Sequence, residues 1–139
     1  MLILDSDHLA EIDRSSPIGL ALSDRLRKQS RTPATTIVSI EEQLRGWLAL
    51  LNRERVPERL IIPYSRLQSR LGFYSKWTVL PFDLAAAGQL EALARSKLRI
   101  GSMDLRIASI VLAVRGATLL SRNLVDFSKV PGLAVESWL

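Results

Sequence analysis

The residues that could do chemistry begin at the start of the chain, where two aspartates follow a short apolar run. Residues 1–4 are apolar and few enough to form a buried strand, and Asp5 and Asp7 come directly afterwards. In open α/β sheets the functional crevice lies at the carboxyl ends of the strands, so this pattern places Asp5 at the mouth of such a crevice. The simpler alternative is that both aspartates only cap the next helix. The choice between a site role and simple capping depends on whether other acidic residues also follow the ends of strands.

Two adjacent glutamates in the helix that follows the second expected strand are further candidate site residues. The β-branched run 35–39 predicts a strand, and a helix is expected over residues 40–52, so Glu41 and Glu42 fall in its first turn. Glu41 lies nearer to the apolar stripe of this helix. Glu42 lies one turn before Gly46, where a helix surface without a side chain leaves room for another element or a ligand. Periodicity alone leaves both glutamates open.

The second half of the chain adds two aspartates. Asp104 lies near the start of the most apolar helix, expected over residues 102–116, and shares a face with core positions. An unpaired carboxylate there is costly unless the helix dipole, a cation or a metal holds it, and a pure capping role is the alternative. The strand expected at 118–121 delivers Asn123 and Asp126 at its carboxyl end.

Strands that alternate with helices must position these residues. The pattern predicts strands at residues 1–4, 35–39, 77–80, 118–121 and 133–135, and helices at about 17–31, 40–52, 57–73, 84–95 and 102–116. Such alternation predicts right-handed crossovers and a mainly parallel sheet, in which the carboxyl ends of the strands lie at the same edge. We therefore expect a single α/β domain over residues 1–139, in which Asp5, one of the two glutamates, Asp104 and Asp126 converge.

Composition excludes several functional classes. With 139 residues, of which 47% are hydrophobic and 24% charged, the chain can bury an ordinary core. Neither a membrane span nor a secretory signal is expected. The chain has no cysteine and a single histidine, His8, which excludes thiol catalysis, zinc-thiolate sites and paired imidazole catalysis. These features lead us to expect a cytoplasmic protein.

The charge balance indicates the kind of substrate. The formal net charge is +5, which favours a polyanionic partner. Clustered carboxylates raise one another's pKa and hold their charge best around hard divalent cations. A chain without thiols and with one imidazole favours Mg²⁺ or Mn²⁺ over zinc. Because such ions neutralise phosphate oxygens and activate water, a phosphodiester is the expected substrate.

Four stretches of the sequence carry a resemblance to a known family. Residues 4–8 (LDSDH), 39–46 (SIEEQLRG), 103–108 (MDLRIA) and 121–127 (SRNLVDF) resemble the PIN domain, specifically the VapC-type toxins of bacterial toxin–antitoxin pairs. The resemblance covers essentially the whole chain and is most specific over residues 121–138. It implies a three-layer α/β/α PIN-like fold with a central, mainly parallel sheet of about five strands.

The resemblance also implies roles for individual residues, and it favours Glu42 over Glu41 because the family's glutamate stands four residues before a glycine, here Gly46. Serine stands where threonine is more common in the family after the first aspartate, and it keeps the hydroxyl. Asp7 would be an extra acid that supports the site from outside. The family's catalytic and metal-binding quartet would be Asp5, Glu42, Asp104 and Asp126, with Ser6, Ser121 and Asn123 as supporting polar residues.

By this resemblance the chain would be a Mg²⁺- or Mn²⁺-dependent endoribonuclease that cleaves structured RNA and inhibits translation. Its expected partners are a second copy of itself, in a homodimer, and a small VapB-like antitoxin that reaches the active site. One alternative is a catalytically silent PIN-fold module that binds RNA or a partner. A phosphatase of the haloacid dehalogenase type is a weaker alternative, since Lys129 is poorly placed for that chemistry.

Overall fold

The fold is organised around a five-stranded parallel sheet in the order β3-β2-β1-β4-β5. The structure is a computed structural model that describes residues 1–139. The strands are β1 (Leu2–Leu4), β2 (Pro33–Thr36), β3 (Thr78–Leu80), β4 (Thr118–Leu120) and β5 (Val135–Glu136). The central strand β1 pairs in parallel with β2 on one side and β4 on the other. The strand order therefore reverses at β1, and the crevice expected at such a switch point lies at its carboxyl end.

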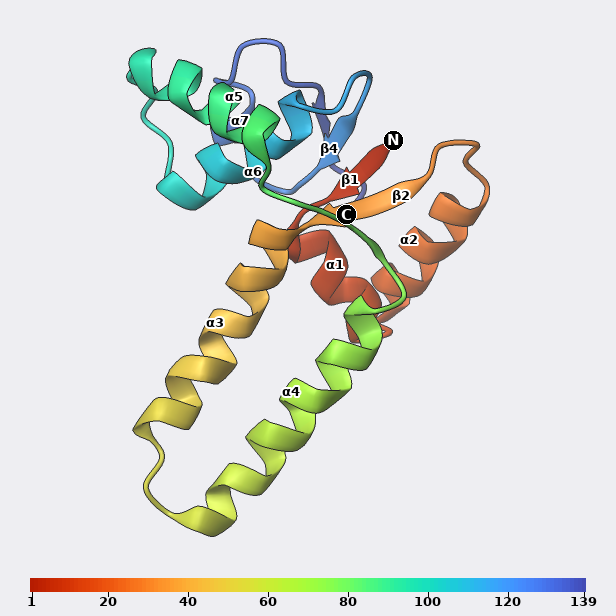
Figure 1. The fold of residues 1–139 in the computed structure, drawn as a ribbon. Coiled ribbons are helices and arrows are strands. Elements are labelled where there is room, and N and C mark those ends of the chain that lie inside the picture. Colours follow the sequence, from red (N-terminus) through yellow and green to blue (C-terminus); the bar gives the residue numbers. More distant parts are fainter.

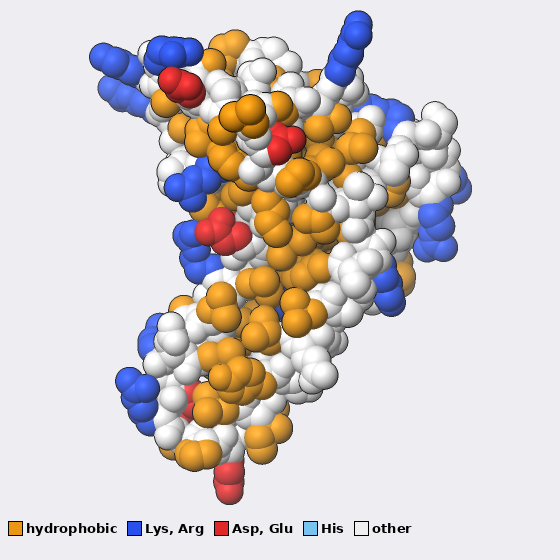
Figure 2. All heavy atoms as spheres, in the orientation of Figure 1, with side chains coloured by type: hydrophobic (Ala, Val, Ile, Leu, Met, Phe, Trp, Pro, Cys, Tyr) orange, Lys and Arg blue, Asp and Glu red, His pale blue; other side chains and the backbone are white.

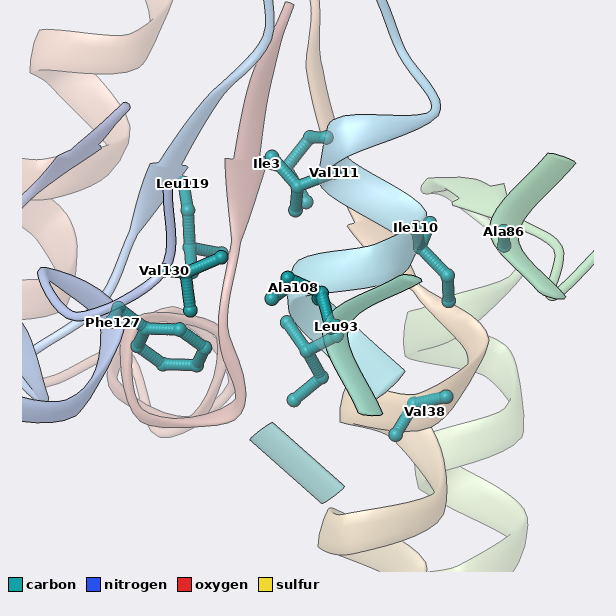
Figure 3. Close-up of a cluster of buried hydrophobic side chains, with 11 residues drawn as sticks. Ile3, Val38, Ala86, Leu93, Ala108, Ile110, Val111, Leu119, Phe127 and Val130 are labelled. Atoms are coloured by element: carbon teal, nitrogen blue, oxygen red, sulfur yellow. The ribbon is translucent and has the colours of Figure 1, made fainter. Parts of the chain in front are cut away.

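Helices cover both faces of the sheet, which makes the three layers visible in Figure 1. Successive strand residues point to opposite faces. Leu2, Leu4 and Leu120 pack with the helices that follow β1, whereas Ile3 and Leu119 pack with the later helices (Figure 3). The helices are α1 (Ser6–Asp13), α2 (Pro17–Arg27), α3 (Ile37–Arg53), the 3-10 helix η1 (Pro57–Leu60), α4 (Ile61–Tyr74), α5 (Leu84–Arg95), α6 (Ser102–Leu112) and α7 (Leu124–Phe127). The predicted three-layer α/β/α fold is confirmed.

Helices α3 and α4 leave the body of the molecule together and form a long antiparallel arm (Figure 1). The helical spacing of the apolar residues on α4 predicts that Ile61, Tyr64 and Leu71 face inward, and they do not. Ile61, Tyr64 and Leu71 are 67%, 56% and 59% exposed. The reason is geometric: α4 packs mainly along α3, so its broad apolar stripe has one neighbouring helix and the rest of the stripe is in solvent (Figure 1).

The boundaries around the second strand differ from those expected. β2 ends at Thr36, and the Thr36 side chain accepts a hydrogen bond from the Ser39 backbone N–H at 2.9 Å. Ile37 and Val38 are therefore helical, although their β-branched side chains favour strand. The capping hydrogen bond to the Thr36 side chain outweighs that strand preference. The shift moves Glu41 and Glu42 from the first turn of the helix into its second.

Two short helices and one helix end were not located by the sequence pattern. α1 and α7 have too few residues to show a clear apolar stripe. At α6 Ser102 is the first helical residue, with Gly101 in the N-cap position, and the helix ends at Leu112 rather than near residue 116. No helix of the structure has the length and apolar character needed to cross a membrane.

Close packing and ion pairs fix α1, which carries the first residues of the candidate site. A Cβ atom added at Gly19 would lie 2.0 Å from the Glu11 carbonyl oxygen, so glycine allows α2 to approach α1 closely. On the other side Arg70 of α4 forms an ion pair with Asp13 at the end of α1. The last turn of α1 is thereby held between α2 and the arm, which fixes the helix that carries the first site residues.

Candidate active site

The Asp5 carboxylate lies at the centre of the candidate site, directly after the central strand. Asp5 is 5% exposed and is the N-cap of α1. Its Oδ1 atom accepts hydrogen bonds from the Ser6 backbone N–H at 2.7 Å and from the Ser39 hydroxyl at 3.4 Å. Its Oδ2 atom accepts from the Ser121 hydroxyl at 2.7 Å. Capping and a role in a polar site are therefore compatible, since one carboxylate does both.

Glu42 reaches the same place from α3. The Ser6 hydroxyl donates to Glu42 Oε2 at 2.8 Å and so places this carboxylate beside the first turn of α1. Glu41 is exposed, forms a 3.4 Å ion pair with Arg45 and lines an apolar groove on another face of α3. The geometry thus brings Glu42, and not Glu41, to the carboxyl edge of the sheet. A Cβ at Gly46 would meet nothing within 4 Å, so the open helix surface expected there is present.

Asn123 connects the two remaining acids. Its side-chain amide nitrogen donates to Asp104 Oδ2 at 3.0 Å and to Asp126 Oδ2 at 3.1 Å. Asp104 lies in the first turn of α6 and Asp126 in α7. The Lys129 ammonium donates to the other Asp126 oxygen at 2.7 Å. One amide therefore bridges two like charges, while a lysine compensates one of them.

The loop after β4 links the two halves of this arrangement. The Ser121 hydroxyl donates to Asp5 and also accepts the Asn123 backbone N–H at 3.1 Å. Asp5 and Asn123 are thereby connected through a single buried hydroxyl. Acids from β1, α3, α6 and α7 face one region, although they are far apart in sequence.

The electrostatics show where negative charge is least compensated. Burial raises the pKa of Asp5 to about 6, and the nearby charges of Asp7 and Glu42 add to this effect. Burial also raises the pKa of Asp104, together with the charges of Glu42 and Asp126. The hydrogen bond from Lys129, followed by that from Asn123, lowers the pKa of Asp126. Excess negative charge is therefore concentrated between Asp5, Glu42 and Asp104.

These residues fit a hard divalent cation by their chemistry. Every possible metal ligand in the acidic group is a carboxylate oxygen, which suits Mg²⁺ or Mn²⁺. A cation would offset the burial and the repulsion that together raise the pKa of Asp5 and of Asp104. As placed, the acids are joined through hydroxyl and amide groups, and no three of them surround one common point. Side-chain rotation would be needed to bring the carboxylates around an ion.

Several contacts in this region were not found from the sequence. Gln43 donates to the Ser6 carbonyl at 2.7 Å and accepts from the Tyr74 hydroxyl at 2.5 Å, and so ties the start of α1 to the arm. His8 contacts Asp7, whose position the sequence had left open. The contacts of Gln43 could not have been indicated by residue spacing, because they depend on how separate helices pack.

Comparisons with known proteins agree with the fold. No family model matches the chain. Over 85 residues it is 35% identical to a protein from Salmonella typhimurium named tRNA(fMet)-specific endonuclease VapC, an alignment covering 58% of this chain and 64% of that protein. The chain thus spans about 64% of the length of the curated relatives it matches.

Solved structures show the likeness over the whole chain. A chain of VapBC2 from Rickettsia felis, crystallised with a DNA fragment from its promoter, superposes with a TM-score of 0.71 at 23% identity, covering 99% of this chain and 98% of that one. A chain of DNA-bound VapBC from Salmonella typhimurium gives a TM-score of 0.69 at 25% identity over 99% of this chain and 98% of that one.

Fold and acidic edge together define the class: a three-layer α/β/α chain of the PIN-like type, with carboxylates gathered at the switch point of a parallel sheet. Within that class, this chain is similar in sequence to a protein named VapC and similar in structure to chains of VapBC complexes. The resemblance stated from the four sequence stretches is confirmed.

Proposed function

We propose that the chain is an endoribonuclease that depends on Mg²⁺ or Mn²⁺ and cleaves structured RNA as the toxin of a toxin–antitoxin pair that inhibits translation. One observation carries the proposal: four acids from separate segments are linked in one hydrogen-bonded group at the sheet edge through Ser6, Ser121 and Asn123. A basic protein gains nothing from such an acidic group for binding a polyanion unless cations offset it. Similarity to proteins named as VapC endonucleases supports the assignment.

In this proposal Asp5, Glu42, Asp104 and Asp126 hold the metal. The ion supplies charge neutralisation at the scissile phosphate and activation of water. The Ser6 hydroxyl orients Glu42 and the Ser121 hydroxyl orients Asp5, each by donating to one carboxylate oxygen. Asn123 keeps Asp104 and Asp126 together despite their repulsion. The Lys129 ammonium balances Asp126 and lies where an incoming phosphate would also be attracted.

An apolar groove supports the proposed antitoxin as a partner. A cavity of about 740 Å³ lies between α3 and the segment that leads into α5. Figure 2 shows apolar side chains continuing from the body along the arm. Such a surface suits an amphipathic segment of another chain. The groove is lined by Ile37, Val38, Ile40, Glu41, Leu44, Leu48, Phe82, Leu90 and Arg106.

A homodimer is the second proposed assembly. Leu84 is 90% exposed at the start of α5, and Ile61 and Ile62 on the arm are 67% and 68% exposed. Exposed aliphatic side chains of this size are typical of surfaces that another chain covers. Light scattering of the purified chain, with and without the antitoxin, measures both assemblies.

The central experiment uses protein freed of any small partner that purifies with it. Bulk tRNA, including initiator tRNA, is incubated with the protein in Mg²⁺, in Mn²⁺ and in EDTA. We expect discrete fragments with either metal and none in EDTA. Asp5→Asn should reduce cleavage to background, while Glu91→Gln, which alters an exposed acid on α5, should leave it unchanged.

The outcomes separate the enzyme from its alternative. Fragments that require both metal and Asp5 support the proposed nuclease. If the protein retains RNA equally well in EDTA and never cleaves it, it is a binding module with this fold. Divalent metal should also raise the melting temperature, because a ligand that binds only the folded state stabilises it.

A further inference from the structure

Two polar residues beside the acidic group have no part in the proposed reaction. Asp7 and His8 lie in the first turn of α1. His8 is the only histidine of the chain, and its side chain is completely buried. Its Nδ1 atom lies 2.6 Å from Asp7 Oδ1, and its Nε2 atom lies 3.1 Å from the Trp138 backbone nitrogen. The ring therefore stands between the candidate site and the last residues of the chain.

The partners of His8 determine where its ring hydrogen lies. A backbone N–H can only donate, so the contact with Trp138 requires an Nε2 atom that carries no hydrogen. The hydrogen of the neutral ring then resides on Nδ1 and is donated to Asp7. Both ring nitrogens are used, and they connect two segments at opposite ends of the sequence.

Asp7 is itself fully engaged by donors of the protein. Its Oδ1 atom accepts from the His8 backbone N–H at 2.5 Å and from the His8 ring. Its Oδ2 atom accepts from the Arg122 backbone N–H at 2.8 Å. Both oxygens of Asp7 are therefore occupied by hydrogen-bond donors of the protein, which makes Asp7 an acceptor in the framework of the site rather than a free ligand.

The loop that Asp7 holds is the one that organises the acids. Arg122 lies between Ser121, which donates to Asp5, and Asn123, which donates to Asp104 and Asp126. We propose that Asp7 and His8 are positioning residues that join this loop to the start of α1, with the Trp138 backbone as the far support of the His8 ring. In so doing they set the position of Ser121 and Asn123 relative to Asp5. We therefore expect them to affect metal affinity, and this expectation rests on the proposed function.

The first test is independent of any nuclease activity. Because the chain has one histidine, selective ¹⁵N labelling of histidine gives NMR signals from His8 alone. We expect the pattern of a neutral ring with hydrogen on Nδ1 and none on Nε2. A ring with hydrogen on Nε2, or rapid averaging between the two tautomers, would overturn the proposal.

The second test separates the two contacts of the ring. In His8→Asn the side-chain amide lies close to the former Nδ1 position and can still donate to Asp7. In His8→Gln the longer side chain can accept from Trp138 but not donate to Asp7 at the same time. Asp7→Asn removes an acceptor while leaving the size unchanged, and circular dichroism checks that each variant folds.

The readout is Mn²⁺ affinity measured by calorimetry. Supporting residues around metal ligands typically contribute about 10–100-fold in affinity. We expect a loss in that range for Asp7→Asn and His8→Gln, and an affinity near that of the parent protein for His8→Asn. Equal losses in both His8 variants would contradict positioning through Asp7. Complete loss of Mn²⁺ binding in Asp7→Asn, as expected for Asp5→Asn, would make Asp7 a direct ligand instead.

These measurements remain decisive if the proposed function fails. A protein that binds Mn²⁺ but cleaves no RNA is not the proposed nuclease, yet the affinities still judge the positioning role. If the protein does not bind Mn²⁺, the tautomer of His8 alone decides whether the Asp7–His8 contact exists as described.

Discussion

Replacing Asp5 by asparagine should remove cleavage and, at neutral pH without metal, make the protein more stable. Burial raises the pKa of Asp5 from 3.8 to about 6. Ionising the carboxyl in the folded state at pH 7.5 therefore costs about 3 kcal/mol relative to the unfolded chain. Asparagine carries no such cost. If its amide oxygen still accepts from the Ser6 backbone N–H, its amide nitrogen faces the Ser121 hydroxyl and cannot accept from it, and that loss offsets about 1 kcal/mol. The expected net gain is about 2 kcal/mol.

The pH dependence gives the sign of this effect. When folding raises the pKa of a carboxyl, its contribution to the free energy of unfolding is fully present below the pKa of the unfolded state. That contribution is lost as the pH rises through the pKa of the folded state. The parent protein should therefore lose stability relative to Asp5→Asn between about pH 4 and pH 6, and the difference should stay constant above that range. At pH 4 the variant should be the less stable of the two, because only the lost hydrogen bond remains.

The assay is urea denaturation in EDTA at several values of pH, with Asp24→Asn on the exposed face of α2 as the control. EDTA keeps divalent metal from stabilising the parent protein. If Asp5→Asn is no more stable than the parent at pH 7.5, or if the difference between them does not change with pH, the reasoning about buried charge at Asp5 is refuted. Cleavage by the same variant is measured separately with Mg²⁺.

Three further predictions concern other contacts. Glu42→Gln should reduce RNA cleavage far more than Glu41→Gln, because only Glu42 faces the site; the opposite order in a cleavage assay would assign the role to Glu41. Gly19→Ala should destabilise the fold by about 1–3 kcal/mol in chemical denaturation, because its methyl group would collide with a backbone carbonyl of α1, and an unchanged midpoint would contradict that packing. Lys129→Met should strengthen Mn²⁺ binding, because it frees a carboxylate oxygen of Asp126; calorimetry showing weaker binding would mean that the lysine supports the site.

The apolar runs of the sequence were sufficient to predict the sheet. Residues 2–4 and 118–120 are all buried, and all of them except Thr118 are apolar, while the long helical segments between the two runs required crossover connections. Parallel strands then had to end at one edge, which is why Asp5 could be proposed as a site residue from its place after the first run. The boundaries were less certain, since a single capping side chain, that of Thr36, turned two β-branched residues into helix.

The environment of each candidate side chain depended on the tertiary structure. Glu41 and Glu42 are neighbours in sequence, and only the direction in which α3 leaves the sheet separates them. The connection of Asn123 to two aspartates, and of Asp7 to a distant backbone N–H, joins residues that share no periodicity. Sequence patterns show which face of a helix or strand is apolar, and so they predict how the layers pack and where the strands end. Hydrogen bonds between elements depend on distances of a few ångströms, and these are set only when the elements pack.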